Sequence, residues 1–221
     1  MKRSNSKILT THTGSLPRPT GLQDLLLTRD ERREFDPGTF SEGVRGAVAE
    51  VIKKQTDIGL DVINDGEQGR AQYATYVKDR LTGFEGERII RSRQRLDDID
   101  FPEYAVQRSQ SSSTTIPQPA CTGPIAWKDW PAVQTVIDTF KSSLAGAQVE
   151  EVFMTAASPG VIANSLPNEY YPTEEAYLYA LADVMNDEYK AIVSAGLLLQ
   201  IDCPDLAMTR VSQFSHLSVE E

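Results

Sequence analysis

The sequence holds few of the residues that build metal centres or disulfide frameworks. It has two cysteines and two histidines in 221 residues. Cys121 and Cys203 lie far apart, so they form neither a CxxC pair nor the spacing of a disulfide scaffold. His12 and His216 show no ligand spacing either. Because a zinc site normally takes four protein ligands or three and a water, the chain alone is expected to hold no stoichiometric zinc.

Long apolar runs and an excess of basic residues are also missing. No run approaches the roughly 18 apolar residues of a membrane span, and the N-terminal sequence MKRSNSKILTTHTG lacks the apolar core of a signal peptide. The chain has 22 basic and 32 acidic residues, for a formal net charge of −10. That balance disfavours a nucleic-acid surface, because phosphate binding needs a basic face. Composition therefore predicts a soluble, cytoplasmic protein with neither a nucleic-acid nor a membrane partner.

Short apolar strands alternate along the chain with longer stretches of helical periodicity. Thr39 and Glu42 have the spacing of a capping box, and Gly59 suits the end of the helix that follows them. Strands that alternate with helices favour an α/β protein with a parallel sheet. The predicted strands lie near residues 10, 63, 122, 153 and 200, and the predicted helices span about 39–58, 129–144 and 173–195.

Residues 84–120 interrupt this alternation. Four arginines between positions 88 and 95 are followed by acidic residues at 97, 98 and 100 and by a Ser/Thr run from 109 to 115. Such a composition predicts an excursion from the main body, built as a hairpin with a mobile tip. The arginines either grip an anionic substrate tail or are neutralised by the neighbouring aspartates, and the aspartates favour the second interpretation.

Polar residues follow the predicted strands at their carboxyl ends. In parallel α/β folds the active site gathers at that end of the sheet. The placement therefore indicates an enzyme. The residues concerned are Ser15, Asp65, Glu67, Thr122, Thr155 and Asp202.

Five short motifs, taken together, resemble the cobalamin-independent methionine synthase family, in its catalytic barrel and its shorter stand-alone relatives. They are TTHTGSLPR at 10–18, DGE at 65–67 with Arg70, TGP at 122–124, SPG at 158–160 with NEYY at 168–171, and QIDCP at 200–204. Each motif alone is unspecific, but the ordered set spans nearly the whole chain. The first motif also resembles the epoxyalkane:coenzyme M transferases of the same wider group.

The resemblance implies a (β/α)8 barrel of the TIM type, of which about five βα units are expected here. Such a barrel typically needs about 250 residues, and the fifth predicted strand ends only at Asp202. Ser218 and Glu221 have the spacing of a capping box that begins another helix. Residues 1–221 are therefore expected to be the N-terminal part of a single, incomplete barrel domain. A complete five-stranded open sheet is the alternative.

The activity that the resemblance implies is zinc-dependent methyl transfer from a methylated folate, or another donor, to the thiol of homocysteine in methionine biosynthesis. A thiol with a pKa near 8.5 is mostly protonated at neutral pH, and coordination to zinc deprotonates it. The zinc ligands of the family are His, Cys and acidic residues beyond the fifth strand. They have no counterpart in this sequence.

The resemblance also implies how the amino acid is held. Thr13, Gly14 and Ser15 match the segment that binds the homocysteine carboxylate, and Glu67 and Asp202 match the acids that pair with its ammonium group. Small residues let backbone N–H groups approach a carboxylate, and two acids suit one cation. A plain tight turn is the alternative for the first set. Strand-end capping or a structural ion pair is the alternative for the second.

Three further residues are candidates for binding the substrate or the donor, namely His12, Asp65 and Trp127. Trp127 offers a stacking face for a pteridine unless it is a core residue. Cys203 stands where methionine synthases usually have glutamate, and with no nearby histidine a packed thiol is favoured over a nucleophile. Met208 replaces a folate-binding acid, which leaves the methyl donor open.

Three functions remain open from the sequence. The chain represents a methionine-synthase-like methyltransferase, a coenzyme M-type thiol alkyltransferase, or a non-catalytic truncated fragment or pseudo-enzyme. The missing zinc ligands favour the third for this polypeptide alone. An incomplete barrel also has unpaired edge strands, which predict self-association or a complementary C-terminal chain.

Overall fold

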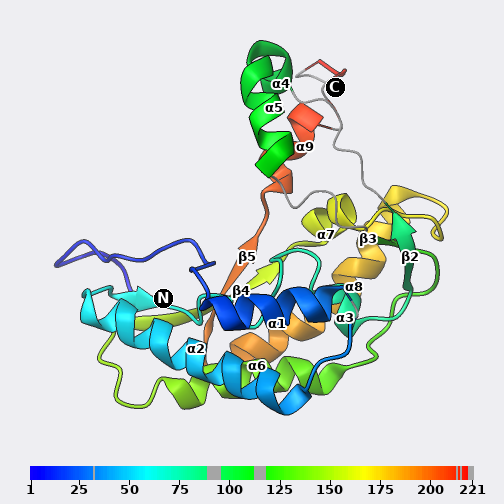
Figure 1. The fold of residues 1–221 in the computed structure, drawn as a ribbon. Coiled ribbons are helices and arrows are strands. Elements are labelled where there is room, and N and C mark those ends of the chain that lie inside the picture. Colours follow the sequence, from blue (N-terminus) through cyan, green and yellow to red (C-terminus); the bar gives the residue numbers. More distant parts are fainter. Residues whose placement is uncertain (32, 89–95, 112–117, 213, 215, 219–221) are drawn as a thin grey trace.

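The computed structural model describes residues 1–31, 33–88, 96–111, 118–212, 214 and 216–218. Within these residues the main sheet has three parallel strands in the order β1-β4-β5, formed by β1 (Val62–Ile63), β4 (Glu151–Ala157) and β5 (Leu198–Asp202). The fold is thus α/β, as the alternation predicts. The described residues do not form five parallel barrel strands, however, because this sheet contains only three (Figure 1).

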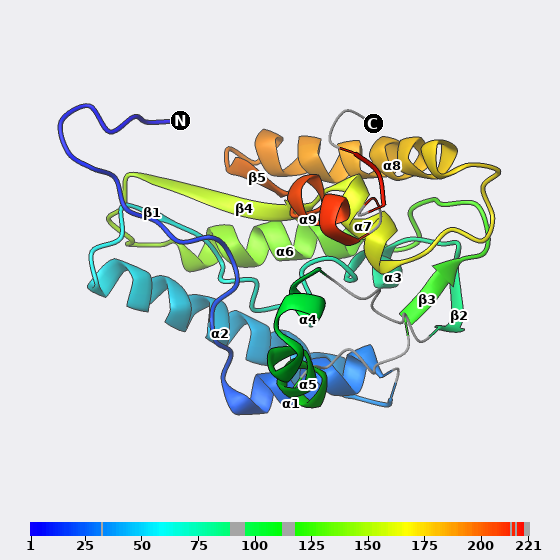
Figure 2. The ribbon, with the colours of Figure 1, turned by 90° about the horizontal axis from the view of Figure 1, so that it is seen from above.

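Three helices lie side by side along one face of this sheet (Figure 1 and Figure 2). They are α2 (Pro37–Asp57), α6 (Trp130–Ser143) and α8 (Glu174–Ser194). Their apolar stripes meet the sheet in one buried cluster, to which β4 contributes Met154 and Ala156. Because side chains alternate along a strand, Phe153 and Thr155 point to the opposite face. That second face of β4 is therefore the one available for a site.

Helix ends follow capping chemistry, with one correction to the expected cap of α2. The predicted N-cap Thr39 is wrong, because the carboxylate of Asp36 accepts the hydrogen bond from the Thr39 backbone N–H at 2.7 Å and the helix begins at Pro37. Asp129 and Thr173 cap α6 and α8 in the same way. Gly59 has φ +81°, the left-handed conformation expected just beyond a helix.

Two further buried clusters and two buried ion pairs join three shorter helices to this body. α1 (Thr20–Asp30) packs on α2. α3 (Val77–Arg80) and α7 (Pro159–Ser165) pack with α8 around Tyr177, Leu181 and Met185. The pairs are Lys78 with Asp30 at 2.7 Å and Arg80 with Glu188 at 3.1 Å.

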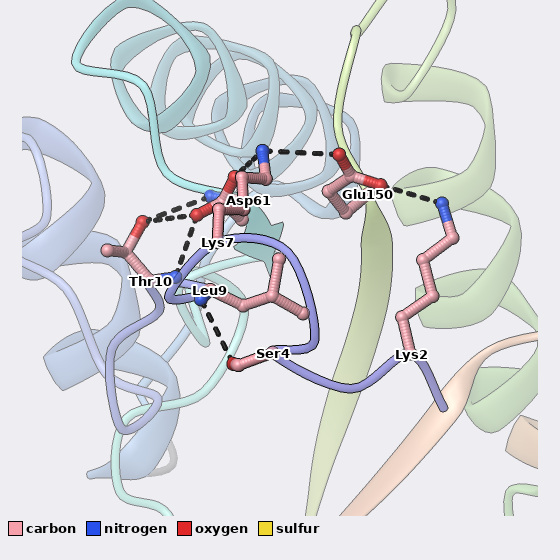
Figure 3. A network of polar contacts seen from close by, with 7 residues as sticks. All are labelled: Lys2, Ser4, Lys7, Leu9, Thr10, Asp61 and Glu150. Atoms are coloured by element: carbon pink, nitrogen blue, oxygen red, sulfur yellow. Dashed lines mark hydrogen bonds and ion pairs between the residues drawn. The ribbon is translucent and has the colours of Figure 1, made fainter.

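The strand expected near residue 10 is extended chain held beside β1 rather than a strand. The backbone N–H groups of Asp61 and Val62 both donate to the Thr10 carbonyl, at 3.1 and 3.0 Å, so no ladder develops. The Asp61 carboxylate accepts from the Thr10 N–H at 2.8 Å and pairs with Lys7 at 2.6 Å (Figure 3). Hydrogen bonds and an ion pair to the Asp61 side chain therefore hold this segment beside β1, where pairing with a neighbouring strand was expected.

The strand expected near residue 122 is also outside the parallel sheet. It is β3 (Gln118–Cys121), which pairs antiparallel with β2 (Phe84–Arg88). α4 (Leu96–Asp100) and α5 (Pro102–Ser111) lie between these two strands in the chain, so the segment returns to its starting point. Of the arginine cluster, Arg88 pairs with Glu169 at 2.8 Å instead of the expected aspartates. Outside the described residues lie three further arginines of the cluster, Arg91, Arg93 and Arg95, and positions 112–115 of the Ser/Thr run at 109–115.

The last element is α9 (Asp205–Ser212), which directly follows β5 and contacts α7. In the part of the chain that the structure describes, none of the helices combines the length and apolar character needed to cross a bilayer. The helix predicted to begin at Ser218 falls on residues 219–221, which lie outside the described part.

Candidate functional site

The candidate site lies where β4 and β5 end, on the sheet face opposite α2, α6 and α8. The parallel register pairs Thr155 with Gln200 and Ala157 with Asp202. Partners in register point to the same face of a sheet, so Thr155, Gln200 and Asp202 share the face that the helices do not cover. This register brings together residues that are about 45 positions apart in the chain.

The turn after β1 places Glu67 on the sheet face that the helices do not cover. The Asn64 side chain accepts the Gly66 N–H at 2.8 Å, and the Asp65 carboxylate accepts the Glu67 N–H at 3.0 Å. Such side-chain bonds two residues onward define Asx-turns. Gly66 and Glu67 both have positive φ, +63° and +55°. Glycine tolerates this conformation, whereas glutamate adopts it only when surrounding contacts impose it.

The Glu67 side chain is buried, with 2% of its surface exposed. Its Oε1 accepts a hydrogen bond from the Thr155 hydroxyl at 2.8 Å. Gly14 lies directly against it, because a Cβ built on Gly14 would be 2.9 Å from Oε1 and 3.1 Å from Cγ2 of Thr155. Burial raises the pKa of Glu67, and the Arg70 charge and the Thr155 hydrogen bond oppose that shift. The charges of Asp202 and Asp65 raise the pKa further.

Asp202 is held by the residue two positions before it. Gln200 Nε2 donates to Asp202 Oδ1 at 2.8 Å and to the Thr13 carbonyl at 2.5 Å. The amide therefore joins the end of β5 to the loop that contains Gly14. On the other side of this loop, the Asn64 amide donates to the Gly14 carbonyl at 3.3 Å.

The electrostatic environment of the site is acidic. Burial and the charges of Asp202, Asp205 and Glu67 all raise the pKa of Tyr73, a partly exposed residue in the loop beyond Arg70. These three carboxylates therefore act on one phenol. Several carboxylates that act on the same place suit a ligand with a positive charge, such as an ammonium group.

The structure brings several sequence-predicted residues to this place. Gly14, Glu67 and Asp202 are linked through Thr155, Gln200 and the backbone of Thr13, as described above. Thr13 and Ser15 are exposed. Asp65 is 4% exposed and shapes the turn through its bond to the Glu67 N–H.

His12 is directed toward α2 instead. Its Nε2 lies 2.7 Å from Oε1 of Gln55, and its ring lies 6.1 Å from that of Phe153. The Gln55 amide nitrogen donates to the carbonyls of Val51 and Asn64, so its oxygen accepts from His12. This geometry braces the N-terminal loop against the helix layer.

Trp127 is a packing residue between α6 and α8. Its ring meets that of Trp130 edge to face at 4.8 Å, and its indole N–H donates to Asp187 at 3.2 Å. It also contacts both buried clusters. Trp127 is partly buried, and its role as a stacking face for a pteridine stays a prediction.

The residues present do not fit a zinc site in the described part of the chain. No group of three or more His, Cys, Asp and Glu side chains there is arranged to hold a metal ion. Cys121 is buried in β3, and burial raises the pKa of its thiol. The Cys203 thiol donates to the Ile201 carbonyl at 3.5 Å. The expectation that the chain alone holds no zinc stays a prediction.

Two arginines that contribute to the site were not singled out as binding residues. Arg18 donates from Nη2 to the Glu67 carbonyl at 2.8 Å, and burial lowers its pKa. Arg70 is 4% exposed and bonds to Thr155. A cavity of about 20 Å³ beside Arg70 accommodates a water molecule and not an amino acid. The only sequence signals for these residues are their places in the first two motifs.

Residues 8–152 match the family described as cobalamin-independent synthase, catalytic domain. Methionine synthase of Sulfolobus acidocaldarius is 24% identical over 196 residues, covering 88% of this chain and 51% of that protein. Methionine synthase of Pyrococcus furiosus is 25% identical over 200 residues, covering 86% and 50%. The chain spans about half the length of these curated relatives.

Solved structures show the same fold. A B12-independent methionine synthase from Shewanella sp. W3-18-1, in complex with selenomethionine, superposes with a TM-score of 0.66 at 21% identity, over 88% of this chain and 51% of that one. A putative vitamin-B12-independent methionine synthase from Listeria monocytogenes gives 0.58 at 21% identity, over 89% and 53%. Since the family match covers well over half of its residues, the chain belongs to the cobalamin-independent synthase catalytic-domain family.

Proposed function

We propose that this chain carries the amino-acid-binding residues of a methionine-synthase-like methyltransferase, whose acceptor is the thiol of homocysteine or a similar amino acid. The observation that supports this most directly is the pair of acids beside a glycine. Glu67 lies in the turn after β1 and Asp202 ends β5, and the charge of Asp202 raises the pKa of Glu67. Gly14 leaves no side chain between its backbone and Glu67.

An amino acid fits this arrangement through both of its charged groups. Its ammonium group lies between the carboxylates of Glu67 and Asp202, where charge-assisted hydrogen bonds are strong. Its carboxylate meets the segment from Thr13 to Ser15, whose exposed hydroxyls and backbone N–H groups are donors. The Shewanella relative was solved with selenomethionine, which has the same two groups.

The proposed reaction transfers a methyl group from a methylated folate or another donor to the thiol sulfur, in methionine biosynthesis. The bond between the methyl carbon and the donor breaks with its electron pair left on the donor, the carbon–sulfur bond forms, and the thiol proton passes to the demethylated donor or to solvent. The zinc that the family uses would favour the thiolate, but the residues described here do not fit its site. The part assigned to this chain is therefore binding and orientation of the amino acid.

The two alternative functions differ from the proposed one in the charge of the thiol substrate and in whether methyl transfer occurs. A coenzyme M-type thiol carries a sulfonate, which two carboxylates would repel, and the relatives reported above are named methionine synthases. A non-catalytic fragment or pseudo-enzyme remains distinguishable by experiment, since it would bind the amino acid without supporting methyl transfer.

The proposed partners include a further polypeptide as well as the small-molecule thiol and donor. Among the described strands, β5 pairs only with β4, so its other edge has unpaired backbone groups. The relatives are about twice as long as the region matched. We infer that strands from a complementary chain or a second copy cover this edge.

The test of the proposed function is calorimetric titration of the full chain with L-homocysteine and with 4-mercaptobutanoate, which lacks the amino group. Glu67→Gln removes one partner of the ammonium group. It should weaken homocysteine binding by roughly tenfold or more, as expected for a lost charged hydrogen bond. Binding of 4-mercaptobutanoate should stay unchanged or improve.

Glu42→Gln is the matched control, because Glu42 is an exposed glutamate on α2 and the variant has the same net charge. Loss of binding in Glu67→Gln should not come from unfolding. A carboxyl group whose pKa is raised in the folded state loses stabilisation as pH rises through that pKa, so its neutral replacement should be at least as stable at pH 7. Equal binding of both thiols by the wild-type chain would refute the amino-acid assignment.

A further inference from the structure

Arg70 and Thr155 form a two-point contact behind Glu67. The guanidinium donates from Nη1 to the Thr155 hydroxyl at 3.1 Å and from Nη2 to the Thr155 carbonyl at 2.8 Å. It also lies over the Tyr76 ring, 4.4 Å from the centroid. Both Arg70 and Thr155 are buried, at 4% and 1% exposure. The guanidinium thus contacts both the hydroxyl and the carbonyl of Thr155 and limits the orientations that the hydroxyl can take.

The donors and acceptors in this contact allow one arrangement of protons. Arginine has donors only, so the Thr155 oxygen must accept from Arg70. The single hydroxyl proton is then free to be donated, and Glu67 Oε1 lies 2.8 Å away. A carboxylate accepts hydrogen bonds and has none to give. Arg70 therefore makes Thr155 an obligatory donor to Glu67.

The second acid, Asp202, also accepts a hydrogen bond from an uncharged side chain. Gln200 is the register partner of Thr155, and its Nε2 donates to Asp202. The two acids thus each receive one hydrogen bond from adjacent positions on β4 and β5. Neither of these donors carries a charge.

We propose that Thr155 and Gln200 are positioning residues, which orient Glu67 and Asp202 toward the ammonium group of the bound amino acid. This inference rests on the proposed function, and it adds the residues that set the specificity of the site for an amine. An arginine bonded directly to Glu67 would occupy the carboxylate and repel the ammonium group. A hydroxyl fixes the same oxygen and leaves the negative charge for the ligand.

The second oxygen of Glu67 is available for this purpose. Within the described residues, Oε2 accepts no hydrogen bond, and it is not among the buried side-chain atoms that lack a partner. We therefore assign this oxygen to the ammonium group of the ligand, in a residue that as a whole is 2% exposed.

The experiment compares Thr155→Val, which keeps the shape and loses the donor, with Thr155→Ser, which keeps the hydroxyl. The first readout needs no ligand. It is the pKa of Glu67, followed by NMR of the ¹³C-labelled carboxyl in the full chain. Because a hydrogen bond to the ionised form lowers a carboxyl pKa, Thr155→Val should raise it and Thr155→Ser should restore it. The charged or titratable groups acting on Glu67 are Arg18, Asp65, Arg70, Tyr73 and Asp202, and all are retained in both variants.

The second readout is the ratio of the affinities for L-homocysteine and 4-mercaptobutanoate. Thr155→Val should lower this ratio by roughly tenfold, and Thr155→Ser should keep it near the wild-type value. Should the valine variant fail to fold, Thr155→Ala compared with Thr155→Ser gives the same contrast.

The two proposals fail in different ways. An unchanged pKa and an unchanged affinity ratio in Thr155→Val would overturn the positioning role, even if homocysteine binds well. A wild-type chain that binds no homocysteine would refute the proposed function. In that case, a raised Glu67 pKa in Thr155→Val and a wild-type Glu67 pKa in Thr155→Ser would still show that Thr155 orients Glu67.

Discussion

Glu67 combines a buried carboxyl group with a backbone conformation that glutamate seldom adopts. Its φ is +55° and its side chain is 2% exposed. Each feature opposes folding, since positive φ strains a residue with a Cβ and burial disfavours the charge. The bonds from Thr155, from Arg18 to its carbonyl and from its own N–H to Asp65 hold it in place. Such concentrated strain is typical of ligand sites.

Gly14 is predicted to be essential at this position for a steric reason. In Gly14→Ala the new Cβ would lie 2.9 Å from Glu67 Oε1, so the carboxylate must move away from Thr155. We expect a loss of homocysteine affinity of roughly tenfold or more, as for a lost hydrogen bond to a charged group. Calorimetric titration measures it.

The matched control is Gly46→Ala, in the middle of α2, where an added Cβ meets nothing within 4 Å. Alanine is the better helix former, so this variant should gain about 0.5–1 kcal/mol of stability and bind normally. Normal binding by Gly14→Ala would mean that the close approach of Gly14 to Glu67 is unimportant for the ligand.

Sequence reasoning singled out the two acids and the glycine of the candidate site, but not the residues that donate hydrogen bonds to the acids. Gly14, Glu67 and Asp202 each follow a predicted strand, and that position is visible in the sequence. The contact between Thr155 and Glu67 joins residues 88 positions apart and depends on strand order. No local pattern encodes that distance, so Thr155 was noted only as a strand-end residue.

At the scale of elements, α2, α6 and α8 could be predicted because their apolar residues keep a helical period over several turns. The exact cap was less predictable. Asp36 and Thr39 are both good N-cap residues, and Pro37 fits the first helical position, where its missing N–H is no loss. The N-cap therefore lies three residues before the expected one, and the helix begins at Pro37.

The attachment of the N-terminal segment to β1 is predicted to depend on pH through Asp61. Bonds from Lys7 and from the Thr10 N–H and hydroxyl lower the pKa of Asp61 from 3.8 to about 2. The stabilising contribution of a group with a lowered pKa is complete above its unfolded value and is lost as pH falls through the folded one. The segment should therefore stay attached at pH 4 and be released only toward pH 2.

The Thr10 amide proton reports this directly in an NMR titration, since its bond is to the carboxylate. We expect a midpoint near 2 in the wild-type chain and no such titration in Asp61→Asn. A midpoint near 3.8, the ordinary value for aspartate, would show that Lys7 and Thr10 do not hold Asp61 in solution.

For the whole molecule, the exposed edge of β5 predicts association of the isolated chain. Ile201 on this strand is 42% exposed, and Leu206 at the start of α9 is 82% exposed. An unpaired edge next to apolar side chains is a template for another chain, although the net charge of −10 opposes aggregation. Light scattering at micromolar concentration should detect species larger than a monomer.

Ile201→Lys should reduce this association, because a charge on an edge strand blocks pairing. Val193→Lys, on the exposed side of α8 and 57% exposed, adds the same charge away from the edge and should not. A monodisperse wild-type monomer with a cooperative thermal transition would contradict the prediction.

The architecture itself could be predicted only in outline. Alternating strands and helices are enough to indicate an α/β fold, but they do not say which strand pairs with which. Thr10 and Cys121 lie in extended segments of the kind expected, yet one is held by the Asp61 side chain and the other pairs antiparallel in β3. These outcomes depend on competing hydrogen-bond partners far away in the sequence.

The parallel register between β4 and β5 has a consequence for how correct folding should be assayed. Side chains alternate along a strand, so a slip of one residue would turn Gln200 and Asp202 to the helix side. A chain with that slip could keep the same helices and the same circular dichroism spectrum, yet it would be unable to recognise an amine. Spectroscopic helix content is therefore a poor criterion of quality for preparations of this protein, and the fraction of molecules competent to bind ligand is the informative one.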